Sequence, residues 1–128
     1  MIAHYTQAAI VSELKRLAVP ASVDSIPTSA MQEDHVSMGW AAGRKLRRAL
    51  DGLARVLTIE LLTAARGIEL RSPLEPAPAT AAVIASLRET VPGHGPDRHM
   101  APEIEAALEF VTSGRARSAA ESTTGPLA

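Results

Sequence analysis

The chain has 128 residues, enough for one small domain, and its 46% of hydrophobic residues includes only 2% of Phe, Trp and Tyr. Its core must therefore be built from Ala, Leu, Ile and Val, a mixture that favours helices packed on helices. With 13 Lys and Arg against 14 Asp and Glu, the formal net charge of -1 gives no overall attraction to nucleic acid or to anionic lipid.

The chain contains no cysteine, which excludes disulfides and thiolate metal sites and is typical of a reducing compartment. The first residues lack the basic and apolar regions of a signal peptide, and no apolar run approaches the ~18 residues of a membrane span. We therefore expect a cytoplasmic protein with neither a membrane nor a nucleic-acid partner.

Apolar residues at helical spacing predict a first helix from Ile2 to Ala18, which Pro20 ends. The periodicity is already under way at Met1, without a capping residue before it. This favours a chain that begins inside a helical element.

The strongest periodicity predicts one long helix from about Met38 to Leu70, with leucines at 46, 50, 53, 57 and 61. Its stretch from Val56 to Leu62 is apolar on nearly every side, so we expect it to be buried all round. At 1.5 Å per residue such a helix is about 45 Å long, more than the core of this chain needs. The helix is therefore expected to pack against other polypeptide.

A Pro-rich connector, Arg71 to Ala79, separates the long helix from a third helix over Thr80–Thr90. A fourth helix is predicted to begin near Pro102 and to end at Gly114. Residues 115–128, rich in Ser, Ala, Thr and Gly, are predicted to form a disordered tail.

The loop from Pro20 to Met38 is the chemically richest stretch of the chain. Ser29-Ala30-Met31-Gln32 matches a capping box, which predicts that a short helix opens there. Glu33, Asp34 and His35 follow at once, but consecutive side chains point in different directions and cannot close round one metal ion. The same adjacency prevents Asp34, His35 and Ser37 from aligning as a hydrolytic triad.

Gln32 and Glu33 place an amide beside a carboxylate, a pair that could orient a polar substrate or relay a proton in a dry pocket. The structural alternatives remain open. Gln32 is equally explained by the capping box, and Glu33 by the preference of a helix N-terminus for negative charge.

Two further groups of ionisable residues have plainer interpretations. The basic cluster on the long helix has Trp40 as its only aromatic neighbour, so a solvated or subunit-facing surface is favoured over phosphate binding; its residues are Arg44, Lys45, Arg47 and Arg48. His94 and His99 flank a Gly- and Pro-containing loop at no metal-binding spacing and are expected to be exposed.

The stretch PASVDSIPTSAMQEDHVSMG, Pro20 to Gly39, closely resembles the C-terminal signature of histidine ammonia-lyases, in the family that includes phenylalanine and tyrosine ammonia-lyases. The similarity extends from Met1 through Arg71 and, more loosely, over Pro96–Glu105. It implies an all-α fold: a long-helix bundle that forms the C-terminal part of the aspartase/fumarase-like helical fold of ammonia-lyases. Residues 1–114 would be that helical segment.

The resemblance also implies a homotetramer with active sites shared among subunits, and an electrophilic cofactor, methylidene-imidazolone, made from an Ala-Ser-Gly triplet. This chain contains no such triplet, and Thr112-Ser113-Gly114 is a helix stop. The tyrosine that acts as base in the family has no matching residue here, so the isolated chain is expected to be inactive.

What the resemblance assigns to this chain is a catalytic and substrate-binding role for Glu33, with Gln32 as a neighbouring substrate-binding residue. Relatives that act on aryl amino acids typically show Asn-Gln-Asp where this chain has Gln32-Glu33-Asp34, which favours histidine. The implied function is non-oxidative deamination of L-histidine to urocanate and ammonia, in histidine degradation. The alternatives are an aryl amino acid ammonia-lyase or aminomutase, or an inactive helical fragment that only pairs with other subunits.

Overall fold

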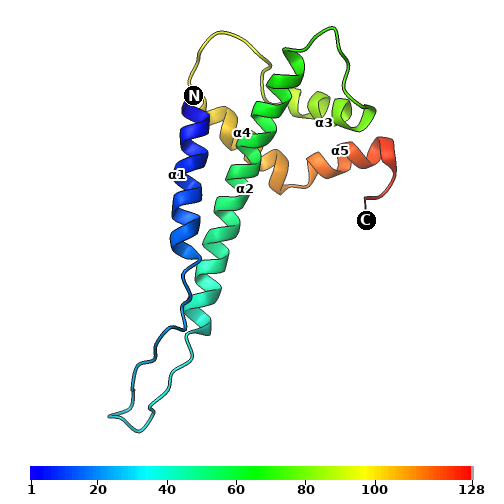
Figure 1. Cartoon of the computed structure of the whole chain (residues 1–128). Helices are drawn as coiled ribbons and strands as arrows, with labels where there is room; N and C mark the ends of the chain where they lie inside the picture. The colour runs from blue at the N-terminus through cyan, green and yellow to red at the C-terminus, as the bar shows by residue number, and fades with distance from the viewer. Residues whose placement is uncertain (128) are drawn as a thin grey trace. The chain divides into compact units, whose positions relative to one another are not determined.

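The computed structural model describes residues 1–127 and is all-α, as predicted, with five helices and no strand among these residues (Figure 1). The helices are α1 (Ile2–Leu17), α2 (Gly39–Glu69), α3 (Pro78–Arg88), α4 (Ala101–Thr112) and α5 (Arg115–Thr124). The first four confirm the predicted helices with ends shifted by at most a few residues. No helix in the described part of the chain is both long and apolar enough to cross a membrane.

The chain divides into two compact units, an N-terminal unit of Met1–Leu53 and a C-terminal unit that begins at Ala54. Helix α2 contributes its first half to one unit and its second half to the other. Each unit is described by itself below.

In the N-terminal unit, α1 packs along the first half of α2, and the loop between them forms a long arm (Figure 1). The two helices approach closely at Gly52, where an added Cβ would lie only 2.8 Å from Cδ2 of Leu14. Arg48 lies 3.7 Å from the carboxylate of Glu13, and Lys45 donates a hydrogen bond to the carbonyl of Val19. Two members of the basic cluster therefore tie the end of α1 to α2.

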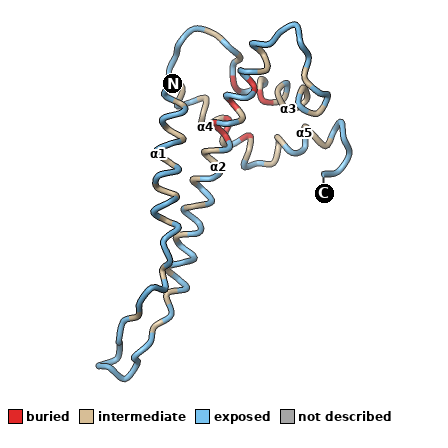
Figure 2. Tube along the Cα trace, viewed as in Figure 1, coloured by how far each residue is buried: buried red, intermediate tan, exposed pale blue. Residues whose placement is uncertain are grey.

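No residue of the N-terminal unit is buried, as Figure 2 shows by its tan and blue trace. Large apolar side chains on α2 remain open to solvent, including Trp40 at 79% and Leu46 at 60% exposed. A two-helix hairpin can cover only one side of each helix, so this unit has no core of its own.

The C-terminal unit holds the core, a cluster of buried side chains from α2, α3, α4 and the loop after α3 (Figure 2). Its members are Leu62, Ala65, Leu87, Val91, Ala107 and Phe110. Thr58 is also buried, and its hydroxyl donates to the carbonyl of Ala54 at 2.8 Å, so this buried hydroxyl has a partner.

The prediction that Val56 to Leu62 is buried all round is wrong. Thr58, Ile59 and Leu62 are buried, whereas Leu57 is 46% exposed. The reason is geometric: within residues 1–127 the later helices cover only one side of α2, and the opposite side keeps its apolar residues in solvent.

The predicted disorder of the tail is wrong for α5, which occupies most of residues 115–128; Ala128 itself lies outside the described residues. Gly114 takes a left-handed φ of 82°, which turns the chain sharply between α4 and α5. Arg115 then bonds Glu89 at 2.6 Å and lies 5.3 Å from the centre of the Phe110 ring. These tertiary contacts stabilise a helix that the polar composition of the segment does not reveal.

Candidate functional site

The candidate site lies on the arm between α1 and α2, where two extended segments run antiparallel. Pro20 stops α1, and Pro27 restricts Ile26 before it to extended conformations. The two segments pair at Thr28 and Glu33: the Thr28 N–H donates to the Glu33 carbonyl at 2.8 Å, and the Glu33 N–H donates to the Thr28 carbonyl at 3.2 Å. Thr28 therefore bonds both the N–H and the carbonyl of Glu33 and holds its backbone in place.

The tip of the arm is a left-handed turn, so the short helix predicted from the capping box is wrong. Ser29, Ala30 and Met31 have φ of 53°, 52° and 68°, and the Gln32 N–H donates to the Ser29 carbonyl at 3.1 Å. A left-handed conformation costs a residue other than glycine about 1 to 2 kcal/mol. The Thr28–Glu33 pairing closes the turn, and a right-handed helix beginning at Ser29 would break that pairing.

Both candidate residues, Gln32 and Glu33, lie at this tip and are exposed. Their side chains make no hydrogen bond or ion pair within residues 1–127. The helix-based explanations for the two residues therefore do not apply in this structure. A solvated carboxylate binds a substrate weakly, however, and catalysis would require other surfaces to exclude water from Glu33.

The other ionisable residues of the loop do not form a second catalytic group. Asp34 and His35 are exposed, and His35 and Ser37 line a cavity of about 340 Å³ at the base of the arm. No set of three or more His, Asp or Glu residues among residues 1–127 is arranged to hold a metal ion. His94 and His99 are exposed, as expected.

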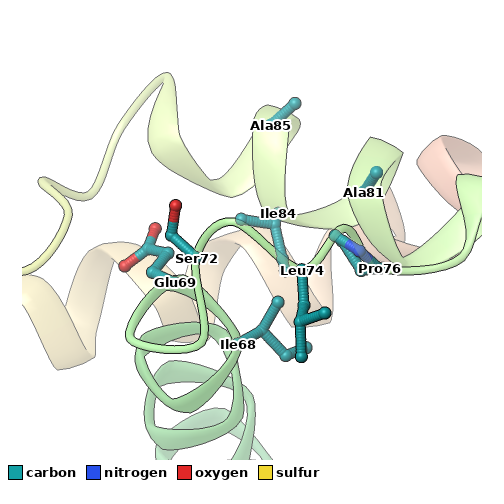
Figure 3. Close-up of a pocket in the computed structure, with 8 residues that line it drawn as sticks. All are labelled: Ile68, Glu69, Ser72, Leu74, Pro76, Ala81, Ile84 and Ala85. Carbon is teal, nitrogen blue, oxygen red and sulfur yellow. The ribbon is translucent and has the colours of Figure 1, made fainter.

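The C-terminal unit contains a pocket that the sequence did not predict. This pocket, shown in Figure 3, lies where α2 ends and α3 begins, with Glu69 and Ser72 as its polar side chains. Its volume is about 280 Å³. The rest of its lining is apolar: Ile68, Leu74, Pro76, Ala81, Ile84 and Ala85. The two Glu69 oxygens lie on the Ser72 side of the pocket, away from Leu74 and Pro76 (Figure 3).

The carboxylate of Glu69 already has a protein partner. Arg88 donates from Nε to Oε1 of Glu69 at 2.6 Å, and this bond holds the pKa of Glu69 below its usual value, with a smaller lowering by the backbone N–H of His94. The charge is neutralised within the protein, so Glu69 is a structural carboxylate and not a free acid or base. The two partners are 19 positions apart in the sequence, with the Pro-rich connector between them, so spacing gave no signal.

The family model for aromatic amino acid lyases matches residues 1–89, which include α1, the whole arm and α2. The chain belongs to the aromatic amino acid lyase family. The resemblance of the Pro20–Gly39 stretch is thereby confirmed.

Several curated relatives of this aromatic amino acid lyase chain are histidine ammonia-lyases. The histidine ammonia-lyase of Streptomyces coelicolor is 65% identical over 99% of the chain, and that of Symbiobacterium thermophilum is 54% identical over 99%. The chain spans about a quarter of the length of both relatives, 25% in each case.

Solved structures of the family confirm the predicted fold. The crystal structure of histidine ammonia-lyase from Trypanosoma cruzi matches with a TM-score of 0.90 and 40% identity, over 95% of this chain and 24% of that one. A tyrosine aminomutase from Streptomyces globisporus matches with a TM-score of 0.86 and 32% identity, over 96% of this chain and 23% of that one. The roles assigned to Glu33 and Gln32 remain predictions.

Proposed function

We propose that this chain is the C-terminal helical part of an enzyme that deaminates L-histidine non-oxidatively to urocanate and ammonia. The observation that supports this most is the identity of 65% to a histidine ammonia-lyase over nearly the whole chain. Residues 1–114 would form the helical segment and contribute to the substrate site. The complete active site requires more of the enzyme than the quarter that this chain covers.

Glu33 is the residue through which the chain would take part in the reaction. Its carboxylate can accept a hydrogen bond from the imidazole N–H of the substrate or assist proton movement, and the amide of Gln32 can bind the substrate beside it. The double hydrogen bond to Thr28 supports this assignment, because it fixes the backbone from which the carboxylate projects.

The methylidene-imidazolone cofactor implied by the family resemblance cannot be made from this sequence, which has no Ala-Ser-Gly triplet. When bound, that group supplies the electrophile that activates the substrate. The residues of this chain would bind and orient the substrate, and Glu33 could assist proton movement. We therefore expect the isolated 128 residues to produce no urocanate from histidine.

The expected homotetramer belongs to the same proposal. Exposed apolar side chains along α2, such as Leu46 and Leu50, support assembly with other segments or subunits of the enzyme. The cytoplasmic location stays a prediction.

Replacement of Glu33 by Gln in the complete polypeptide that carries this sequence tests the assignment. The substitution keeps the size of the side chain but removes its charge, and we expect kcat/KM for histidine to fall by about 100-fold or more. The measurement is the initial rate of urocanate formation. Asp34→Asn, an equally conservative change at the next exposed carboxylate, should leave the rate near that of the unaltered enzyme. An unchanged rate for Glu33→Gln would contradict the proposed role.

The structural match to a tyrosine aminomutase favours a second candidate, an enzyme that acts on an aryl amino acid. The identity of 32% is lower than the 40% to the histidine ammonia-lyase of Trypanosoma cruzi and the 65% to that of Streptomyces coelicolor, so histidine is the preferred substrate. Comparison of kcat/KM for L-histidine and L-tyrosine distinguishes the two. A higher value for tyrosine would replace the first proposal by the second.

A further inference from the structure

The arm between α1 and α2 has a second cross-connection besides the Thr28–Glu33 pair. Ser25 lies three residues before Thr28, and Val36 lies three residues after Glu33, so the two face each other in the same antiparallel register. The Val36 N–H donates to Oγ of Ser25 at 2.7 Å, and the same hydroxyl donates to the Val36 carbonyl at 3.4 Å. One side chain thus satisfies both backbone polar groups of the opposite residue.

The backbone of Ser25 does not make these bonds itself. Its N–H donates to Oδ1 of Asp24 at 2.7 Å. The Ser25 hydroxyl therefore replaces a backbone pair at this point of the arm. Ser25 and Val36 are also among the few partly buried residues of the arm, so water competes less for this connection than for bonds at the exposed tip.

The tip needs such support. Three consecutive residues, Ser29 to Met31, are held in a left-handed conformation that side chains other than glycine disfavour. The two backbone hydrogen bonds of the Thr28–Glu33 pair, with the one from the Gln32 N–H to the Ser29 carbonyl, oppose that strain directly. The Ser25–Val36 connection lies nearer the base of the arm than these bonds. It limits how far the two segments of the arm can separate and how far Glu33 can rotate about the long axis of the arm.

We propose that Ser25 is a positioning residue for Glu33: its hydroxyl joins the two segments of the arm at Val36 and so fixes the direction in which the Glu33 carboxylate is presented. The inference rests on the proposed function of Glu33. Ser25 acts through the backbone of the arm and does not itself contact the substrate.

The first experiment measures the Ser25–Val36 connection without reference to activity. In Ser25→Ala, amide hydrogen exchange in peptides that cover 26–38 should accelerate about tenfold, because two hydrogen bonds are lost. Ser25→Thr retains the hydroxyl and should restore slow exchange. Ser22→Ala, at an exposed serine on the same segment, is the matched control and should leave exchange unchanged. Equal exchange in Ser25→Ala and in the unaltered protein would overturn the proposal.

The second experiment is a double-mutant cycle on histidine turnover in the complete polypeptide. Ser25→Ala should lower kcat about tenfold in the unaltered enzyme and have little further effect when Glu33 is already Gln. Ser25→Thr should recover most of kcat. A loss of the same size in both backgrounds would show that Ser25 only stabilises the fold, which overturns the positioning role.

The two proposals fail in different ways. A rate for Glu33→Gln equal to that of the unaltered enzyme removes the proposed role of Glu33 and, with it, the positioning role of Ser25. Accelerated exchange in Ser25→Ala together with a loss of turnover that depends on Glu33 supports both. Unchanged exchange removes the inference about Ser25 and leaves the role of Glu33 intact.

Discussion

At the scale of single residues, the ion pair between Arg88 and Glu69 joins the end of α2 to α3. The side chains are 19% and 28% exposed, so solvent screens this pair less than the Arg16–Glu13 pair, whose side chains are 71% and 41% exposed. Arg88 also donates to the carbonyl of Pro92 at 3.2 Å, which connects the loop after α3 to the same guanidinium. The pair is therefore expected to stabilise the C-terminal unit.

The pKa of Glu69 determines the pH range of this stabilisation. Because the hydrogen bond from Arg88 lowers the pKa of Glu69 in the folded chain, the unfolded chain binds its proton at a higher pH. The contribution is fully present above the usual carboxyl pKa of 4.5 and is lost as pH falls through the lower folded value. Glu69→Gln should therefore reduce the free energy of unfolding at neutral pH by about 1 to 2 kcal/mol. The variant should also lose less stability than the unaltered chain when the pH is lowered.

Urea unfolding of the 128-residue chain between neutral and acidic pH measures this effect. Glu75→Gln is the matched control, because Glu75 is exposed in the same region and makes no ion pair among the described residues. Equal acid sensitivity of the unaltered chain and Glu69→Gln would contradict the prediction.

At the scale of the elements, two glycines have opposite structural requirements. Gly67 lies inside α2 with no atom within 4 Å of the position of an added Cβ. Gly114 lies between α4 and α5 with a φ of 82°, which an L-residue with a side chain rarely adopts. One glycine weakens its helix, and the other is required by its turn.

Gly67→Ala should raise the free energy of unfolding by about 1 kcal/mol, since alanine favours the helix and meets no neighbour. Gly114→Ala should lower it by about 1 to 2 kcal/mol, since the same methyl group is placed on a left-handed residue. Denaturant unfolding of both variants gives the two values. A Gly114→Ala variant as stable as the unaltered chain would mean that the turn does not require a glycine. A destabilised Gly67→Ala would contradict the prediction for α2.

At the scale of the whole molecule, the N-terminal unit has a continuous apolar face and no core. Leu46, Leu50 and Leu53 recur at spacings of four and three along α2 and are 60%, 54% and 46% exposed. Arg44 and Asp51 lie on the opposite side of the helix at 100° per residue. Exposed apolar faces of this kind mark surfaces that other polypeptide covers.

We expect the 128-residue chain to self-associate through this face, as measured by sedimentation at micromolar concentration. Replacement of Leu46, Leu50 and Leu53 by Gln should shift the population toward the 13.4 kDa monomer. The matched control is Arg44→Gln with Asp51→Asn, which alters the opposite side and leaves the net charge unchanged. A monomeric unaltered chain would contradict the prediction.

The sequence by itself determined the first four helices and the family. The ends of α1 and α2 follow from apolar residues at helical spacing and from Pro20, because a helix is defined by neighbours three and four residues apart. The Pro20–Gly39 stretch was sufficient to predict the family and to single out Gln32 and Glu33. These features depend on residues that are close together in the sequence, so the sequence of one chain is enough to reveal them.

Only the tertiary structure decided the shape of the arm, the Glu69–Arg88 pair and the helix α5. Each depends on partners distant in sequence: Ser25 on Val36, Glu69 on Arg88, and Arg115 on Glu89. The left-handed turn at Ser29 to Met31 opposes the local preferences of its residues and exists because the Thr28–Glu33 pair closes it. Local propensity cannot predict a conformation that is stabilised by pairing across a loop.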